Sequence, residues 1–144
     1  MLRSGHPGLR YQGCFGLAPG TPKGVFFICV WSQLETLDLT WCDIDVTAVS
    51  YLVQAQWPHL KALGLSGNDI NVDTLDLLVE AQWPLLTELD LSRNYLGPGP
   101  VVRLSSGHEL PLNDGQHIVT PPAWLLKQWP GLRVLNLSYC NLEF

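Results

Sequence analysis

One stretch of this chain is followed by a second stretch with a similar sequence. Residues 34–58 recur as residues 60–84, so that the leucines of the first copy and its Gln-Trp-Pro ending reappear 26 residues later. A fixed period of roughly 20–50 residues indicates a repeat architecture, in which each unit buries its apolar face against its neighbours. The period therefore predicts a core shared by successive coils, with functional residues on the surfaces that the coils build together.

A leucine pattern with one Asn or Cys position fits the chain four times. Its copies run from Leu34 to Ile44, Leu60 to Ile70, Leu86 to Leu96 and Leu132 to Leu142. The chain resembles the leucine-rich repeat family over about residues 25–144, with a ribonuclease-inhibitor-like or similar 26-residue type of repeat. This resemblance implies an α/β fold, a short right-handed solenoid with parallel strands on its concave side and helices on its convex side.

The spacing of apolar residues supports the same fold independently. Within the first copy, Leu37 and Leu39 alternate with polar residues, which is the period of a strand with one buried face. Farther along, Val49, Leu52 and Val53 recur at helical spacing, and the second copy repeats both patterns. We therefore expect each strand to pack on its own helix and on the next coil.

Two further positions of the repeat are expected to be structural. Asn68 and Asn94 occupy the Asn/Cys position, where a side-chain amide can bind backbone groups of adjacent coils as a ladder. Cys42 and Cys140 occupy the same position as small buried thiols, and reduced thiols favour an intracellular, cytoplasmic location. Tryptophans that precede a proline are expected to act as spacers between coils: Trp57, Trp83 and Trp129.

The remaining segments break the period. Residues 1–24 are rich in Gly and Pro and predict an irregular or disordered lead, while residues 25–33 indicate the end of a degenerate repeat. The third and fourth copies start 46 residues apart, which places an inserted loop at residues 97–116. This insert could hold a small hairpin, or it could be a decayed extra repeat. A short helix is expected at residues 123–128, after two prolines.

The last copy of the pattern ends two residues before the end of the chain, and no polar capping unit follows it. Terminal repeats usually need such a unit for solubility. The sequence therefore leaves three interpretations open: a fragment of a longer protein, a truncated gene product, or self-association through the uncapped C-terminal end.

Composition and motifs argue against several functional classes. The net charge of −5 argues against a nucleic-acid partner, and the longest apolar run, residues 24–31, is too short for a membrane helix. The four histidines lie in the lead, at a turn, in the insert and directly after it, with no spacing typical of a metal site or a catalytic group. We therefore expect no enzyme, no cofactor and no metal.

The informative positions lie on the outward side of the strands and at the turns after them. We use the name exit column for the positions where the strands end, Trp41, Gly67, Arg93 and Tyr139, because Trp, Arg and Tyr are enriched in interface hot spots. Trp41 could instead fold over the lead and cap the first coil. The predicted partner-binding residues are Asp38, Trp41, Glu88, Asp90, Arg93, Asn136 and Tyr139.

These residues and the family resemblance predict a protein–protein interaction module. It would bind a protein partner on the concave strand face, with the insert at the rim of that face. Two alternatives stay open. One is a regulatory or adaptor segment of a larger protein, such as an enzyme regulator, and the other is a truncated repeat fragment without independent function.

Overall fold

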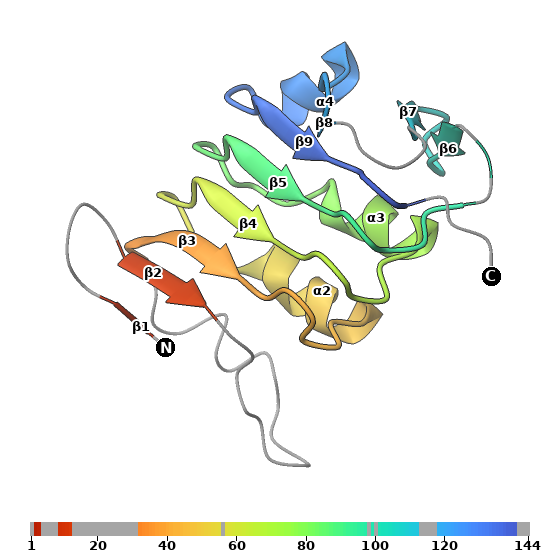
Figure 1. Cartoon of the computed structure of the whole chain (residues 1–144). Coiled ribbons are helices and arrows are strands. Elements are labelled where there is room, and N and C mark those ends of the chain that lie inside the picture. The colour runs from red at the N-terminus through yellow and green to blue at the C-terminus, as the bar shows by residue number, and fades with distance from the viewer. Residues whose placement is uncertain are drawn as a thin grey trace.

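The computed structural model of the chain describes residues 2–3, 9–12, 32–55, 57–97, 99, 101–112 and 118–140. Its main feature is a mostly parallel sheet with helices on one side. In these residues the main sheet has the order β1-β2-β3-β4-β5-β9-β8. Its strands are β1 (Leu2–Arg3), β2 (Leu9–Gln12), β3 (Leu34–Asp38), β4 (Ala62–Gly64), β5 (Glu88–Asp90), β9 (Val134–Asn136) and β8 (Ile118–Val119). The helices α2 (Val46–Gln54), α3 (Val72–Leu78) and α4 (Ala123–Gln128) lie to one side of this sheet (Figure 1).

The strands pair in the register that the 26-residue period predicts. Leu37 of β3 is paired with Leu63 of β4, Leu63 with Leu89 of β5, and Leu89 with Leu135 of β9, all in parallel strands. None of these four leucines is more than 2% exposed. Because paired residues of parallel strands point to the same face, the leucines form one buried row between the sheet and the helices.

The first two helices each begin at a side-chain cap. Asp45 Oδ1 accepts a hydrogen bond from Ala48 N at 2.9 Å, and Asn71 Oδ1 accepts one from Thr74 N at 3.0 Å. Such caps satisfy N–H groups that have no partner within the helix. The apolar stripes that the sequence predicted are buried at Val49, Leu52, Leu75 and Leu78.

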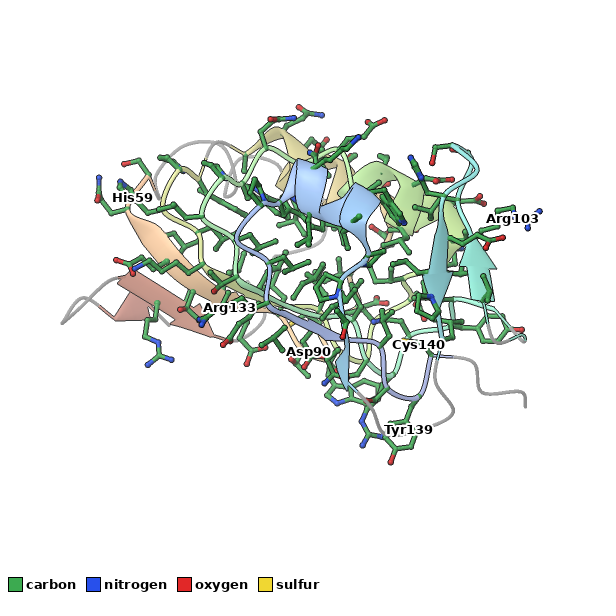
Figure 2. The ribbon with its side chains drawn as sticks, turned by 90° about the horizontal axis from the view of Figure 1, so that it is seen from above. His59, Asp90, Arg103, Arg133, Tyr139 and Cys140 are labelled. Carbon is green, nitrogen blue, oxygen red and sulfur yellow. The ribbon has the colours of Figure 1, made fainter. Side chains whose placement is uncertain are left out.

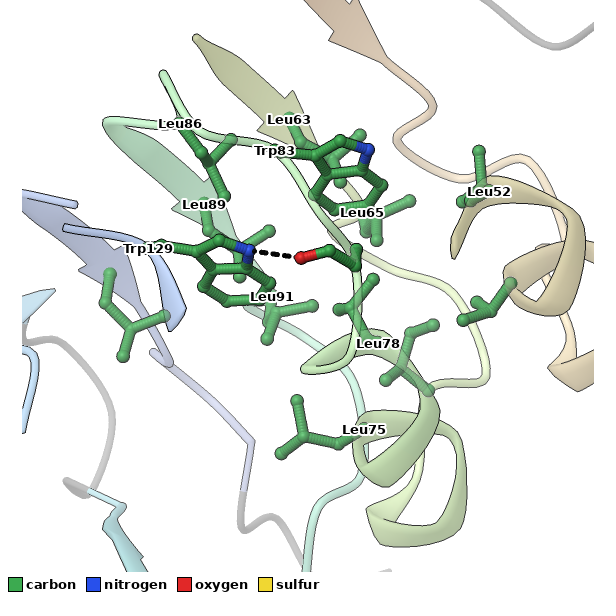
Figure 3. Close-up of a cluster of buried hydrophobic side chains, with 14 of the residues drawn as sticks. Leu52, Leu63, Leu65, Leu75, Leu78, Trp83, Leu86, Leu89, Leu91 and Trp129 are labelled. Carbon is green, nitrogen blue, oxygen red and sulfur yellow. Dashed lines mark hydrogen bonds between the residues drawn. The ribbon is translucent and has the colours of Figure 1, made fainter. Parts of the chain in front are cut away.

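A column of stacked tryptophans runs through the coils where the helices end. The ring centroids of Trp57 and Trp83 are 6.1 Å apart, as are those of Trp83 and Trp129, and the rings are inclined by 20° and 12°. All three side chains are at most 1% exposed. Trp129 Nε1 donates a hydrogen bond to the Ala81 carbonyl at 3.0 Å (Figure 3). The predicted role of these tryptophans as spacers between coils is confirmed.

An asparagine ladder joins the turns of successive coils. Asn68 Oδ1 accepts hydrogen bonds from Cys42 N and Ile44 N, at 3.0 and 2.9 Å, in the preceding coil. Its Nδ2 donates to carbonyls of both coils, at Leu39 and Leu65. Asn94 repeats the arrangement one coil on, and the Cys140 thiol donates to the Leu91 carbonyl at 3.0 Å. The predicted ladder is therefore present.

The two cysteines at the ladder position differ from each other. Cys140 is the buried free thiol that the sequence predicted. Cys42 is half-buried and disulfide-bonded, and its partner cysteine lies outside the described residues. The prediction of a reduced thiol at Cys42 is therefore wrong, because position within a repeat cannot show which cysteine of the chain lies beside it. The inference of a reducing compartment loses this support.

The lead contributes to the sheet. The sequence predicted an irregular lead over residues 1–24, but β2 pairs parallel with β3 and β1 pairs antiparallel with β2. The prediction is wrong for these two strands, because the free edge of β3 supplies backbone partners that local sequence preference does not register. The proposed degenerate repeat at residues 25–33 lies outside the described residues except for Ser32 and Gln33, which form a turn.

The opposite edge of the sheet is also covered. β8 pairs antiparallel with β9, through Ile118 with Asn136 and Val119 with Leu135. A short antiparallel strand therefore occupies the backbone hydrogen-bonding side of β9. Self-association through the C-terminal end stays a prediction. The helix that the sequence predicted at residues 123–128 is confirmed, as α4 (Ala123–Gln128).

The insert contains the small hairpin that the sequence allowed. β6 (Val101–Arg103) pairs antiparallel with β7 (Glu109–Pro111). Asp76 of α3 accepts a hydrogen bond from Ser105 N at 2.9 Å, and Trp124 Nε1 of α4 donates to the Glu109 carbonyl at 3.0 Å. The hairpin thus bridges two helices and fixes the longer connection between β5 and α4.

Candidate functional site

The face of the sheet that points away from the helices, here the open face, carries a shallow hollow. This hollow, the trough, has a volume of about 260 Å³ and lies between the carboxylates of Asp38 on β3 and of Glu88 and Asp90 on β5. Its floor is low because the two residues of β4 that are not buried, Ala62 and Gly64, are small. An ideal Cβ at Gly64 would lie 2.9 Å from Asp38 Oδ1, so the glycine admits the carboxylate into the trough.

Three of the predicted site residues hold the turns that leave the strands. Asp38 Oδ1 accepts hydrogen bonds from the amide and hydroxyl of Thr40, at 3.0 and 2.5 Å. Asp90 Oδ1 accepts the equivalent pair from Ser92, at 3.0 and 2.6 Å, and Asn136 Oδ1 accepts from Ser138 N at 3.0 Å. These residues therefore have a structural role that the sequence reading did not assign to them.

The exit column has an unusual backbone. Trp41, Arg93 and Tyr139 have φ angles of 56°, 59° and 61°, and Gly67 has 72°. Positive φ is rare for residues other than glycine, and a bulky side chain there is strained by about 1–3 kcal/mol. Three coils out of the four keep a large side chain where glycine would be the relaxed choice. Strained backbone of this kind persists only where the surrounding structure enforces it, and it is found most often at binding and catalytic sites.

The side chains of the exit column line a second hollow, the exit groove, of about 510 Å³. The Trp41 side chain is 67% exposed and its ring lies directly over Gly67. The Arg93 guanidinium carbon lies 4.8 Å from the centre of the Tyr139 ring, in a cation–π contact. The sequence reading missed Tyr95, which also lines the groove and is 47% exposed. Its signal was the contrast with Asp43 and Asp69, which occupy the same position in the two preceding coils.

The seven predicted residues thus divide between two hollows. Asp38, Glu88, Asp90 and Asn136 line the trough, and Trp41, Arg93 and Tyr139 line the exit groove. The two hollows adjoin, because residues of both follow one another along the same strands and turns. The alternative reading of Trp41 as a cap over the lead concerns mostly residues outside the described part of the chain; within that part, its ring covers the second coil.

The hairpin of the insert lies beside the helices α3 and α4 and not at the rim of this face, where the sequence prediction had placed the insert. It contacts these helices through Asp76 and Trp124. Figure 2 shows Arg103 of the hairpin at one end of the molecule, far from Asp90 and Tyr139. The reason is that the hairpin has its own apolar residues, which are buried: Val102, Leu104, Leu110 and Leu112.

No cluster of three or more His, Cys, Asp or Glu residues in the described part of the chain could hold a metal ion. His108 stacks on Trp124 with ring centroids 4.7 Å apart, which gives this insert histidine a packing role. Among the described residues, no helix is both long enough and apolar enough to cross a membrane.

The comparisons with known proteins identify one segment. Residues 33–53, which contain β3 and most of α2, match the family model described as Leucine Rich repeat. These residues are a leucine-rich repeat. The same register of strand, ladder residue and tryptophan recurs in the following coils. Leucine-rich repeats are in general protein-interaction modules and are in general not enzymes. No curated protein and no solved structure matches the chain.

Proposed function

We propose that this chain is a protein-interaction module that binds a protein partner with the exit groove and the adjoining open face of its sheet. The observation that carries the proposal is the exit column, in which three large side chains occupy strained positive-φ positions around one groove. Trp, Tyr and Arg are the residues that most often dominate binding energy at protein interfaces.

Packing within the coil does not account for the exposure of these side chains. Trp41 is 67% exposed although the structure buries the tryptophans of the stack at 1% or less. Trp41 and Tyr95 present rigid aromatic surface with few rotatable bonds, which limits the entropy lost on binding. Arg93, held over Tyr139, adds a charged group in a fixed position.

The test is capture of partner proteins from an extract on the immobilised chain. The double variant Trp41→Ala/Arg93→Ala removes one aromatic ring and one cation from the groove. Its matched control, Leu85→Ala/Arg133→Ala, removes one exposed apolar side chain and one exposed arginine that do not line the groove.

We expect the groove variant to lose the captured partner, with an affinity lower by roughly 30-fold or more, since hot-spot truncation costs about 2 kcal/mol or more. The control is expected to retain it. Circular dichroism should give the same spectrum for both variants. Equal capture by the two variants would overturn the proposal.

A further inference from the structure

We propose that the trough on the open face receives a basic side chain, an arginine or lysine carried by an extended segment of the protein partner. This inference rests on the proposed function and adds the chemistry of the partner to it. The trough lies directly beside the exit groove, so a partner segment that reaches Trp41 also passes the carboxylates of Asp38, Glu88 and Asp90.

The negative charges of the trough are not required by the turns. Asp38 and Asp90 bind the turn through Oδ1, and Asn136 makes the same bond to Ser138 N at the same 3.0 Å distance without any charge. An amide oxygen has two lone pairs and can accept both the backbone N–H and the hydroxyl of the first and third turns, so the geometry of these turns does not require a charge. The charge at Asp38 and Asp90 is a property of the open face that the fold itself does not explain.

Within the described part of the chain, no salt bridge neutralises these carboxylates. The salt bridges of the described residues are Lys61 with Glu35, at 2.9 Å, and Arg103 with Glu109, and neither includes a trough carboxylate. The nearby cation Arg93 is directed at the Tyr139 ring. Three carboxylates therefore face one hollow, which favours a positively charged occupant by complementarity.

The shape of the trough suits a long basic side chain. Ala62 and Gly64 leave the space between β3 and β5 open, and the partly exposed Ala62 and Val134 give the lining apolar side-chain surface. The methylene stem of an arginine or lysine can lie on apolar surface while its charged end reaches carboxylates on either side. A guanidinium, with its planar array of donors, can bind carboxylates from two strands at once.

The experiment selects peptides from a random twelve-residue display library on the immobilised chain, at a low salt concentration. The best binders are then resynthesised with each arginine replaced by citrulline, which keeps the shape and removes the charge. Affinity is measured for the unchanged chain and for three variants. Asp38→Asn/Asp90→Asn retains the turn hydrogen bonds and removes two charges, and Glu88→Gln removes the third. Asp73→Asn/Glu80→Gln removes two exposed charges at α3 as the matched control.

We expect enrichment of arginine or lysine among the binders and a loss of about tenfold or more on citrulline substitution, on Asp38→Asn/Asp90→Asn and on Glu88→Gln. The control variant should bind as the unchanged chain does. Affinity should fall as salt rises, because partly exposed charges are screened.

Two results would overturn the inference while leaving the proposed function intact. In the first, the selected binders contain no basic residues but still require Trp41. In the second, their affinity is unchanged by the trough variants but falls with Trp41→Ala. Binding that survives both the trough variants and Trp41→Ala/Arg93→Ala would instead overturn both proposals. Saturable binding of Ca²⁺ by the free protein, abolished by Asp38→Asn/Asp90→Asn, would replace the basic side chain by a metal ion and would also overturn the inference.

Discussion

The ring of Trp41 lies on the bare backbone of Gly67. A Cβ atom added at Gly67 would fall 2.4 Å from Cδ2 and 2.5 Å from Cε2 of the indole, far inside the contact distance of carbon atoms. The two residues occupy the same position in consecutive coils, 26 residues apart. The exposed Trp41 side chain can therefore lie flat only because the next coil has no side chain at this position.

Gly67→Ala is expected to destabilise the protein and to displace Trp41. A φ of 72° costs an alanine about 1 kcal/mol or more, and the methyl group clashes with the indole. The free energy of unfolding, measured by urea denaturation, should fall by about 1–3 kcal/mol. Partner or peptide affinity should also fall, because the ring loses its support.

The same substitution in a Trp41→Ala background separates the two effects. Without the indole only the backbone strain remains, so Gly67→Ala should cost less stability there than in the unchanged chain. Equal costs in the two backgrounds would show that the ring does not lie on Gly67 in solution.

Asn68→Ala should be among the most destabilising single substitutions outside the leucine core. Asn68 is 7% exposed, and its removal leaves the Cys42 and Ile44 amides and the Leu39 carbonyl without their side-chain partner. Each buried backbone group left unsatisfied costs about 1–3 kcal/mol. We therefore expect a loss of about 3 kcal/mol or more in the free energy of unfolding.

Asn71→Ala serves as the control for this prediction. Asn71 is exposed and caps α3 through Thr74 N, so its loss should cost only about 1 kcal/mol. A smaller effect at Asn68 than at Asn71 would contradict the ladder as a major source of stability.

The sequence predicted the parts of the fold that repeat. Leu37, Leu63 and Leu89 recur at one spacing, and identical spacing fixes their parallel pairing and their common burial. Asn68 and Trp83 were placed correctly for the same reason, since each performs one structural task in every coil. A side chain that is required by the stacking of coils recurs in the sequence at the period of the coils.

The features that the sequence did not predict each depend on a partner in another part of the chain. β2 joins the sheet because β3 has an open edge, and the disulfide of Cys42 depends on a second cysteine brought near by the fold. In the candidate site, Trp41 and Arg93 were selected by residue type alone. Their positive φ angles follow from the turn geometry and could not be predicted from residue type. The hydrogen bond that Asp38 Oδ1 accepts from Thr40 N was not predicted, because it too depends on the turn geometry.

The disulfide of Cys42 determines which cysteines can react with an alkylating reagent. Alkylation of the denatured, unreduced protein should modify Cys140 and leave Cys42 unmodified, and peptide mass mapping after separate reduction should identify the partner of Cys42. Reduction should lower the free energy of unfolding by about 2–4 kcal/mol, since a cross-link restricts the unfolded chain. Complete alkylation of Cys42 without reduction, in protein purified under oxidising conditions, would contradict the disulfide.

Cys140 makes the stability of the protein depend on alkaline pH. Burial raises the pKa of its thiol from 9.0 to about 11, with Asp90 contributing repulsion of the thiolate. The unfolded thiol loses its proton near pH 9, whereas the folded thiol keeps it up to about pH 11. The stabilisation is therefore fully present below pH 9 and is lost as the pH rises toward 11, by up to about 2–3 kcal/mol.

Cys140→Ala isolates this effect from the other groups that titrate in the same range. The variant lacks the thiol, so its free energy of unfolding should fall less steeply between pH 9 and pH 11 than that of the unchanged protein. The native thiol should also react slowly with iodoacetamide at pH 8, because the reactive thiolate is scarce and the side chain is 0% exposed. If the free energy of unfolding falls equally steeply with pH in the two proteins, Cys140 does not hold its proton in a buried site. That result would also contradict the position of this thiol at the end of the asparagine ladder.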